Sequence, residues 1–114
     1  MSTITALTEQ TFEQEVGGPG LTVVDFWAPW CAPCRAMAPQ LERAAQLRPQ
    51  YRFAKVNVDE EPNLAAAFRV QAIPTLAVLR DGQLVGTAPG LVQADQLVGV
   101  LDQVAEAPIA GPAA

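Results

Sequence analysis

The sequence predicts an α/β domain in which helices flank a central mixed β-sheet. Runs with strand character alternate with runs of helical spacing along almost the whole chain. Helical runs separate the early strands, as in parallel pairing, whereas a short turn joins the last two strands, as in antiparallel pairing. The 114 residues suffice for one such domain. We expect it over residues 1–106, with a flexible tail over residues 107–114.

Apolar patterns and helix breakers define the elements of the first half. Residues 3–6 can form a leading strand, and Thr8 fits the N-cap of a short helix. The glycines and proline of residues 17–20 end that helix. Residues 21–27 (LTVVDFW) are almost continuously apolar, as in a strand that is covered on both faces. From Met37 onward, apolar residues recur at helical spacing.

The second half of the chain continues this alternation. Residues 51–58 indicate another strand, and Pro62 suits the first position of a short helix. Residues 75–79 and 84–87 predict a hairpin with an Asp-Gly pair at its tip. Residues 93–105 predict a last helix with one apolar face.

Composition and charge exclude several classes of protein. Seven Lys and Arg against 12 Asp and Glu give a net charge of −5, which argues against nucleic-acid binding. The chain contains no histidine, so histidine-based nucleophile pairs, histidine-ligated zinc and imidazole acid–base catalysis are excluded. The two cysteines are the obvious candidates for reactive chemistry near neutral pH.

The sequence shows no membrane or export signal. No stretch is long and apolar enough to cross a bilayer. The first 16 residues lack a basic segment followed by an apolar one. We therefore expect a cytoplasmic protein, and nothing in the pattern requires more than a monomer.

Cys31 and Cys34 are spaced as C-x-x-C at the junction of a strand and a helix. Residues i and i+3 of one helical turn place their Cα atoms roughly 5–6 Å apart, within the range of a disulfide. The free N–H groups at a helix N-terminus stabilise a thiolate at Cys31 and make it more nucleophilic. This pattern favours a redox-active dithiol.

Three other interpretations of the cysteine pair are open at this point: a structural disulfide, a shared metal site and a pair of buried bystander cysteines. A structural disulfide that closes so short a loop would stabilise the fold by only about 2 kcal/mol. A shared metal site would need ligands from a second chain, because two cysteines fill half of a tetrahedral zinc shell. Buried bystander cysteines would not usually lie between two prolines and beside Trp30.

A longer set of motifs points to one family. Residues 24–35 (VDFWAPWCAPCR) combine an acidic strand, W-A-x-W, C-x-P-C and a following base. Further matching blocks follow in order at residues 38–39 (AP), 55–59 (KVNVD), 73–76 (IPTL), 81–82 (DG) and Gly90. On these blocks the chain resembles the thioredoxin family from about residue 4 to residue 104. The resemblance implies the thioredoxin fold and a cis peptide bond before Pro74.

The mechanism that we expect starts at Cys31. As the N-terminal cysteine, it attacks a substrate disulfide and forms a mixed disulfide that Cys34 resolves. Asp25 interrupts an apolar strand, where burial would raise the pKa of its carboxyl group and allow proton exchange near neutral pH. The pattern alone equally allows Asp25 to face solvent, whereas the resemblance favours a proton acceptor for Cys34. Lys55 either modulates Asp25 or lies in solvent.

The resemblance also implies an apolar surface that receives an extended segment of the substrate. We assign Trp30, Ala72, Ile73, Pro74 and Gly90 to this surface. We expect backbone hydrogen bonds from the region of Ile73.

Two alanines depart from the common family pattern. Ala32 replaces the glycine of C-G-P-C, and alanine favours a helix interior over glycine by about 1 kcal/mol. Ala72 stands where many relatives have glycine. We expect Ala32 and Pro33 to tune the redox potential, and both alanines to affect the range of partners more than the chemistry.

We therefore expect a protein disulfide reductase that acts on disulfide-containing proteins. A thioredoxin reductase would recharge it, and no cofactor or metal is implied in this chain. An oxidant or isomerase would use the same residues, because the direction of exchange depends on the potential. A binding or chaperone module without turnover is the alternative from a different class.

Overall fold

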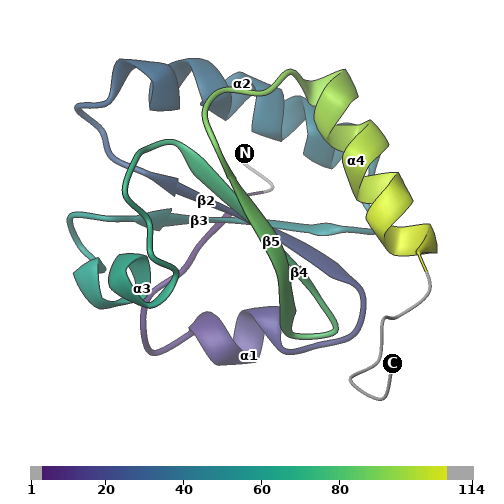
Figure 1. The fold of residues 1–114 in the computed structure, drawn as a ribbon, viewed down its shortest axis with the longest axis horizontal. Helices are drawn as coiled ribbons and strands as arrows, with labels where there is room; N and C mark the ends of the chain where they lie inside the picture. Colours follow the sequence, from purple (N-terminus) through teal and green to yellow (C-terminus); the bar gives the residue numbers. More distant parts are fainter. Residues whose placement is uncertain (1–3, 108–114) are drawn as a thin grey trace.

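The computed structural model describes residues 4–107 of the chain. Five strands form one mixed sheet in the order β1-β3-β2-β4-β5 (Figure 1). The strands are β1 (Thr5–Ala6), β2 (Leu21–Trp27), β3 (Arg52–Asn57), β4 (Thr75–Arg80) and β5 (Gln83–Pro89). The first three are parallel to one another, and the β2–β4 and β4–β5 pairs are antiparallel. The predicted mixed sheet is confirmed.

Four helices cover the two faces of this sheet. The helices are α1 (Phe12–Val16), α2 (Ala32–Leu47), α3 (Pro62–Ala67) and α4 (Ala94–Glu106). α2 and α4 lie on one face, and α1 and α3 lie on the other (Figure 1). This arrangement confirms the predicted α/β architecture.

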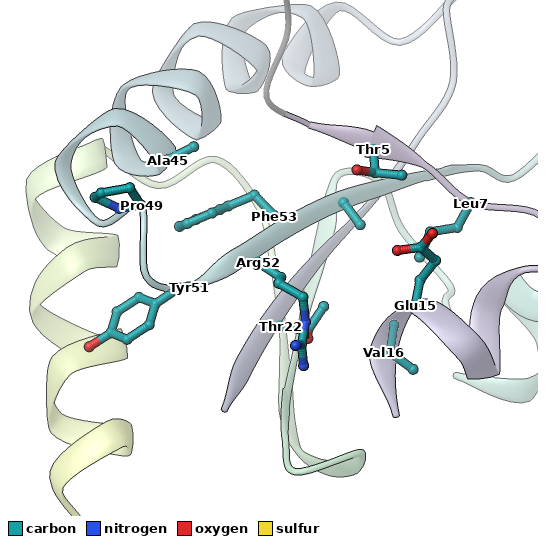
Figure 2. Close-up of a pocket in the computed structure, with 11 residues that line it drawn as sticks. Thr5, Leu7, Glu15, Val16, Thr22, Ala45, Pro49, Tyr51, Arg52 and Phe53 are labelled. Atoms are coloured by element: carbon teal, nitrogen blue, oxygen red, sulfur yellow. Dashed lines mark hydrogen bonds between the residues drawn. The ribbon is translucent and has the colours of Figure 1, made fainter. Parts of the chain in front are cut away.

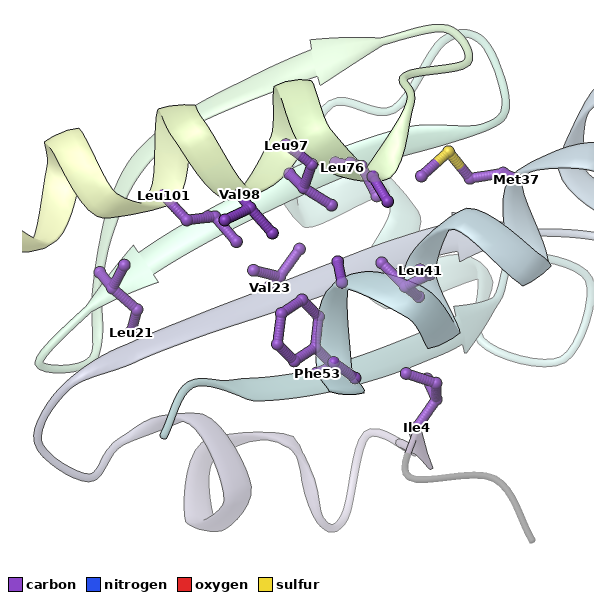
Figure 3. Packing of buried hydrophobic residues seen from close by; sticks show 13 residues of the cluster. Ile4, Leu21, Val23, Met37, Leu41, Phe53, Leu76, Leu97, Val98 and Leu101 are labelled. Carbon is purple, nitrogen blue, oxygen red and sulfur yellow. The ribbon is translucent and has the colours of Figure 1, made fainter. Parts of the chain in front are cut away.

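Alternate residues of β2 face the two helical layers. Leu21 and Val23 pack under α2 and α4 in the larger apolar cluster (Figure 3). Val24 and Phe26 belong to the second cluster, on the side of α1 and α3. Burial on both faces explains why β2 is almost continuously apolar. Asp25 shares the face of Val23, so its carboxyl is directed to the side of the cysteine-bearing helix.

The start of α1 differs from the prediction. We expected Thr8 to be the N-cap, but the helix begins at Phe12 and Thr11 precedes it as the N-cap. The carbonyl of Thr8 accepts hydrogen bonds from the backbone N–H groups of Thr11 and Phe12. The backbone N–H of Thr8 donates to Oγ1 of Thr11 at 3.0 Å. The prediction was therefore wrong because the two threonines form a local turn before the helix.

Polar contacts hold the end of the sheet that lies away from the cysteines. Arg48 donates to both carboxylate oxygens of Asp102, and the Tyr51 hydroxyl donates to Oδ1 of Asp102 at 2.7 Å. Arg52 donates to Oγ1 of Thr22 at 3.0 Å. Figure 2 shows Tyr51 directed toward α4 and Arg52 directed toward Thr22. These contacts connect the end of α2 and the start of β3 to α4 and β2.

The end of α4 is also held to the sheet. Arg80, the last residue of β4, donates to the carbonyl oxygens of Val104 and Ala107. Apart from Ala107, the predicted tail over residues 107–114 lies outside the described residues, and one domain over residues 1–106 stays a prediction. Within residues 4–107, none of the helices has the length and hydropathy to cross a membrane.

Candidate functional site

Cys31 and Cys34 form a disulfide at the start of α2. Their Cα atoms are 5.2 Å apart, within the predicted range. Cys31 is the N-cap residue of the helix, and its Sγ accepts a hydrogen bond from the backbone N–H of Cys34 at 3.2 Å. The structure therefore places the pair at the predicted strand–helix junction, with the first sulfur at the helix terminus.

Both cysteines are buried. Cys31 is 5% exposed and Cys34 is 3% exposed, so the two side chains differ little in exposure. They form a cluster with Ala28, against which Trp27 and Ile73 pack. The Cys31 sulfur lies 3.7 Å from the carbonyl oxygen of Ile73. The backbone of the loop before β4 therefore lies directly beside the Cys31 sulfur.

This loop has a cis peptide bond between Ile73 and Pro74, the bond that the family resemblance implied. Pro74 itself is fully buried, so its ring does not belong to the exposed surface to which we assigned it. Pro74 directly precedes β4, and backbone and side-chain hydrogen bonds hold the loop on both sides of it. The Gly90 N–H donates to the Pro74 carbonyl at 2.8 Å, and the Thr75 hydroxyl donates to the Ala72 carbonyl.

Asp25 lines a cavity together with Cys34 and Lys55. It is 4% exposed, and within the described residues its Oδ1 atom has no hydrogen-bond partner. Burial raises the pKa of Asp25 to about 6, while the positive charge of Lys55 acts in the opposite direction. Of the two interpretations left open by the sequence, the buried carboxyl is confirmed.

Lys55 lies directly opposite Asp25 in the parallel register of β2 and β3. It is half-buried, and its Nζ atom lies 5.2 Å from the ring centroid of Trp27. The structure thus favours the interpretation that places Lys55 beside Asp25 over a fully solvated lysine. In the described part of the chain, no cluster of three or more cysteine or acidic side chains is placed to hold a metal ion.

The exposed surface next to the cysteines centres on Trp30, whose side chain is 66% exposed. Ala72 and Gly90 of the predicted surface are also exposed, and Ile73 is half-buried. Ala32 and Pro33 are exposed in the first turn of α2. A small hollow connects Trp30 to Ala72 and Ile73. The structure therefore brings Trp30, Ala72 and Ile73 together around this hollow, whereas Gly90 does not line it.

Comparison with known proteins identifies the family. The family model described as Thioredoxin matches residues 3–103. The chain belongs to the thioredoxin family.

Individual family members are similar over nearly their whole length. The chain is 45% identical over 105 residues to thioredoxin 1 of Synechococcus elongatus, covering 90% of this chain and 98% of that one. It is 42% identical over 101 residues to the thioredoxin of Staphylococcus aureus, covering 88% and 96%. The X-ray structure of Fasciola hepatica thioredoxin superposes with a TM-score of 0.81 at 35% identity, covering 88% of this chain and 98% of that one.

The thioredoxin homologues and the adjacent cysteine pair identify a thiol–disulfide oxidoreductase that reduces protein disulfides. The alternative of a binding module without turnover is not favoured, because both cysteines are present and paired in this thioredoxin-family site.

Sequence reasoning missed one residue of the site. Nε1 of Trp30 donates to Oδ2 of Asp59 at 2.7 Å, which anchors the exposed indole. Asp59 is held in turn by its backbone N–H, which donates to Oδ1 of Asn57 at 2.9 Å. An Asn two residues before an Asp at a strand end predicts such a turn. The sequence held this signal, but it did not show which tryptophan the carboxylate would reach.

Proposed function

We propose that Cys31 is the nucleophile of this reductase and that Cys34 resolves the mixed disulfide. The Cys31 thiolate attacks one sulfur of the substrate disulfide, and the other substrate sulfur leaves as a thiolate. The Cys34 thiolate then attacks the Cys31 sulfur, which releases the second substrate sulfur. The substrate gains two electrons, and the dithiol loses two and becomes a disulfide.

The observation that supports this order is the hydrogen bond at the start of α2. The Cys31 sulfur accepts the Cys34 N–H at 3.2 Å and lies at the positive end of a 16-residue helix. Both features stabilise negative charge on sulfur, so a thiolate is more stable at Cys31 than at Cys34. Cys34 lies one turn further into the helix and lines the cavity of Asp25.

We assign Asp25 as the proton acceptor for Cys34. The two side chains line the same cavity, and the chain contains no histidine that could take this part. A carboxyl whose burial raises its pKa to about 6 can accept a proton near neutral pH and release it again. Asp25 thus removes the thiol proton of Cys34 when the mixed disulfide is resolved.

A matched pair of serine variants tests the order of the cysteines. With insulin as the disulfide substrate, Cys34→Ser should accumulate a covalent adduct that mass spectrometry detects under non-reducing conditions. Cys31→Ser should form none. Adducts on Cys31→Ser alone would reverse the two roles, and no adduct on either variant would contradict turnover altogether.

We place the substrate segment across Trp30, Ala72, Ile73 and Gly90. The backbone of Ile73 lies beside the reactive sulfur, as a strand-like contact with the substrate requires. In this proposal Pro74 acts through its carbonyl, which holds Gly90, and not through its ring. The exposed Ala32 and Pro33 tune the potential and the fit of the partner.

The electron donor in this proposal is a thioredoxin reductase, and the protein works as a cytoplasmic monomer. Family membership and the net charge of −5 support this assignment. The test is the equilibrium potential of the Cys31–Cys34 couple in defined thiol–disulfide buffers, read by tryptophan fluorescence. We expect a couple on the reducing side of glutathione. An oxidising couple would instead support disulfide formation or isomerisation.

A further inference from the structure

Trp27 belongs to the surroundings of both the dithiol and the buried carboxyl, yet none of the roles assigned above uses it. It is the last residue of β2 and packs against the cluster that contains Cys31 and Cys34. It also lines the cavity of Asp25 and Cys34. Because Trp27 and Asp25 are two residues apart on one strand, their side chains share a face of the sheet.

The Trp27 ring contacts the side chain of Lys55. The distance of 5.2 Å from Nζ to the ring centroid is within the range of a cation–π interaction. Lysine has a long and flexible side chain, so a fixed position of its ammonium requires a contact that holds it. The ring of Trp27 supplies such a contact on the side of the sheet where Asp25 lies.

The Lys55 ammonium acts on the Asp25 carboxyl. The two residues are directly opposite in the β2–β3 register, and both line the same cavity. Burial raises the pKa of Asp25, and Lys55 is the charge that opposes this effect. The other titratable or charged groups that line the cavity are Cys34, Arg35 and Glu42, all of which come from α2.

We propose that Trp27 is a positioning residue for proton transfer, because its indole ring holds the Lys55 ammonium beside the Asp25 carboxyl. The catalytic consequence rests on the proposed function of Asp25, whereas the electrostatic arrangement does not. Without the ring, the ammonium moves toward solvent, where water and salt screen its charge. Asp25 then binds its proton more tightly, so near neutral pH a smaller fraction of the carboxyl is ionised and able to accept the proton of Cys34.

The test is an NMR titration of the Asp25 side-chain carboxyl carbon in the oxidised protein, in which neither cysteine titrates. Trp27→Leu and Lys55→Met should each raise the pKa of Asp25 above its value of about 6. The double variant should match Lys55→Met alone, because the ring acts through the lysine. A Trp27→Leu protein with an unchanged pKa would overturn the proposal.

Trp30→Leu is the matched control. It makes the same substitution at the tryptophan that is bonded to Asp59, and it should leave the pKa of Asp25 unchanged. A role of Trp27 in packing alone would lower stability and shift the pKa equally with and without Lys55, which would also overturn the proposal. Where Trp27→Leu does not fold, Trp27→Phe keeps a weaker π face and should give an intermediate rise.

The pH profile of mixed-disulfide resolution separates this proposal from the role of Asp25. We expect the profile to lose its dependence on the carboxyl in Asp25→Asn and to move to higher pH in Trp27→Leu. If Asp25→Asn leaves the pH profile unchanged, Asp25 is not the proton acceptor, and the catalytic part of the proposal falls with it. If Asp25→Asn changes the profile but Trp27→Leu does not, only the positioning role of Trp27 is overturned.

Discussion

Asp25 and Lys55 lie opposite each other on two parallel strands, with the acid buried and the base half-buried. Within the part of the chain that the structure describes, Oδ1 of Asp25 has no hydrogen-bond partner. The ionised carboxylate is therefore balanced by one charge but incompletely solvated. A buried carboxyl beside Cys34, the group that we propose as the proton acceptor, is thus kept at the expense of stability.

Asp25→Asn should stabilise the oxidised protein at about pH 8 by up to about 3 kcal/mol. The pKa of Asp25 is about 6 in the folded state against an ordinary value of 3.8, so between these values the folded state binds the proton more tightly than the unfolded state. The stability of the wild type should therefore fall as the pH rises from about 4 to about 6 and remain lower above it. Urea unfolding at about pH 4 and about pH 8 measures the effect.

Glu60→Gln is the control for this titration. Glu60 is an exposed carboxylate that follows β3, and its replacement should leave the pH dependence of the wild type intact. A wild-type protein equally stable at both pH values would contradict the burial of an ionisable Asp25.

Asp102→Asn should lower the urea midpoint at neutral pH. Arg48 and then Tyr51 donate to the Asp102 carboxylate and lower its pKa from 3.8 to about 2. The stability that a lowered pKa provides is present above about pH 4 and is lost as the pH falls toward about 2. The midpoints of variant and wild type should therefore converge at low pH. Tyr51→Phe removes one hydrogen bond and should cause a smaller loss, whereas a gap that persists at about pH 2 would argue for a packing defect.

Arg69→Gly should stabilise the protein by roughly 0.5–1 kcal/mol in urea unfolding. Arg69 follows α3 with φ 56, in the left-handed region that glycine adopts without strain. Arg69→Ala keeps the strain and removes the side chain, so it should gain nothing.

Gly20→Ala tests the converse, because Gly20 has φ +93 and an added Cβ there meets no atom within 4 Å. It should lose about 1 kcal/mol through the backbone alone.

Asp59→Ala should raise the KM for protein disulfides by roughly 2- to 10-fold and leave kcat nearly unchanged. The reason is that the exposed Trp30 indole loses the acceptor of its 2.7 Å hydrogen bond. Asp59→Asn keeps an oxygen acceptor for the Trp30 indole, so its KM should stay close to that of the wild type. Insulin reduction supplies both constants. A fall in kcat at constant KM would show that Asp59 acts on the chemistry and not on the binding surface.

Ala32→Gly should change the stability by less than about 1 kcal/mol, because Ala32 begins α2 and does not lie in its interior. The methyl group of Ala32 is exposed in the turn between the cysteines, where a partner must approach. We expect a small change in potential and a larger change in the ratio of kcat/KM between two unrelated protein disulfides. Loss of turnover with every substrate would contradict this view of the alanine.

The layers and the dithiol were predictable from the sequence because their signals are local. The residues of β2 that point to either face of the sheet are mostly apolar, which indicates that helices cover both faces. The spacing of Cys31 and Cys34 fixes their separation within one helical turn. The sequence marked Asp25 as an acidic exception in an apolar strand. Whether its side chain is buried or exposed could be decided only once the position of α2 was known.

The features that sequence reasoning missed depend on contacts between distant segments. Asp102 meets Arg48 and Tyr51 across a separation of about 50 residues, and no local pattern indicates that meeting. Asp59 reaches Trp30 only because the turns after β2 and β3 lie side by side. Pro74 occurs in a recognisable motif, but neither its burial nor the hydrogen bond of its carbonyl to Gly90 follows from that motif.

The Cys31 sulfur, which we propose as the nucleophile, also caps the N-terminus of α2. The Cys34 amide proton is bonded to a neutral sulfur in the disulfide and to a more basic one in the thiolate. The strength of this hydrogen bond therefore depends on the oxidation state of the Cys31 sulfur. We therefore expect the backbone amide NMR signal of Cys34 to report, without any label, the fraction of the protein that is in the reduced state.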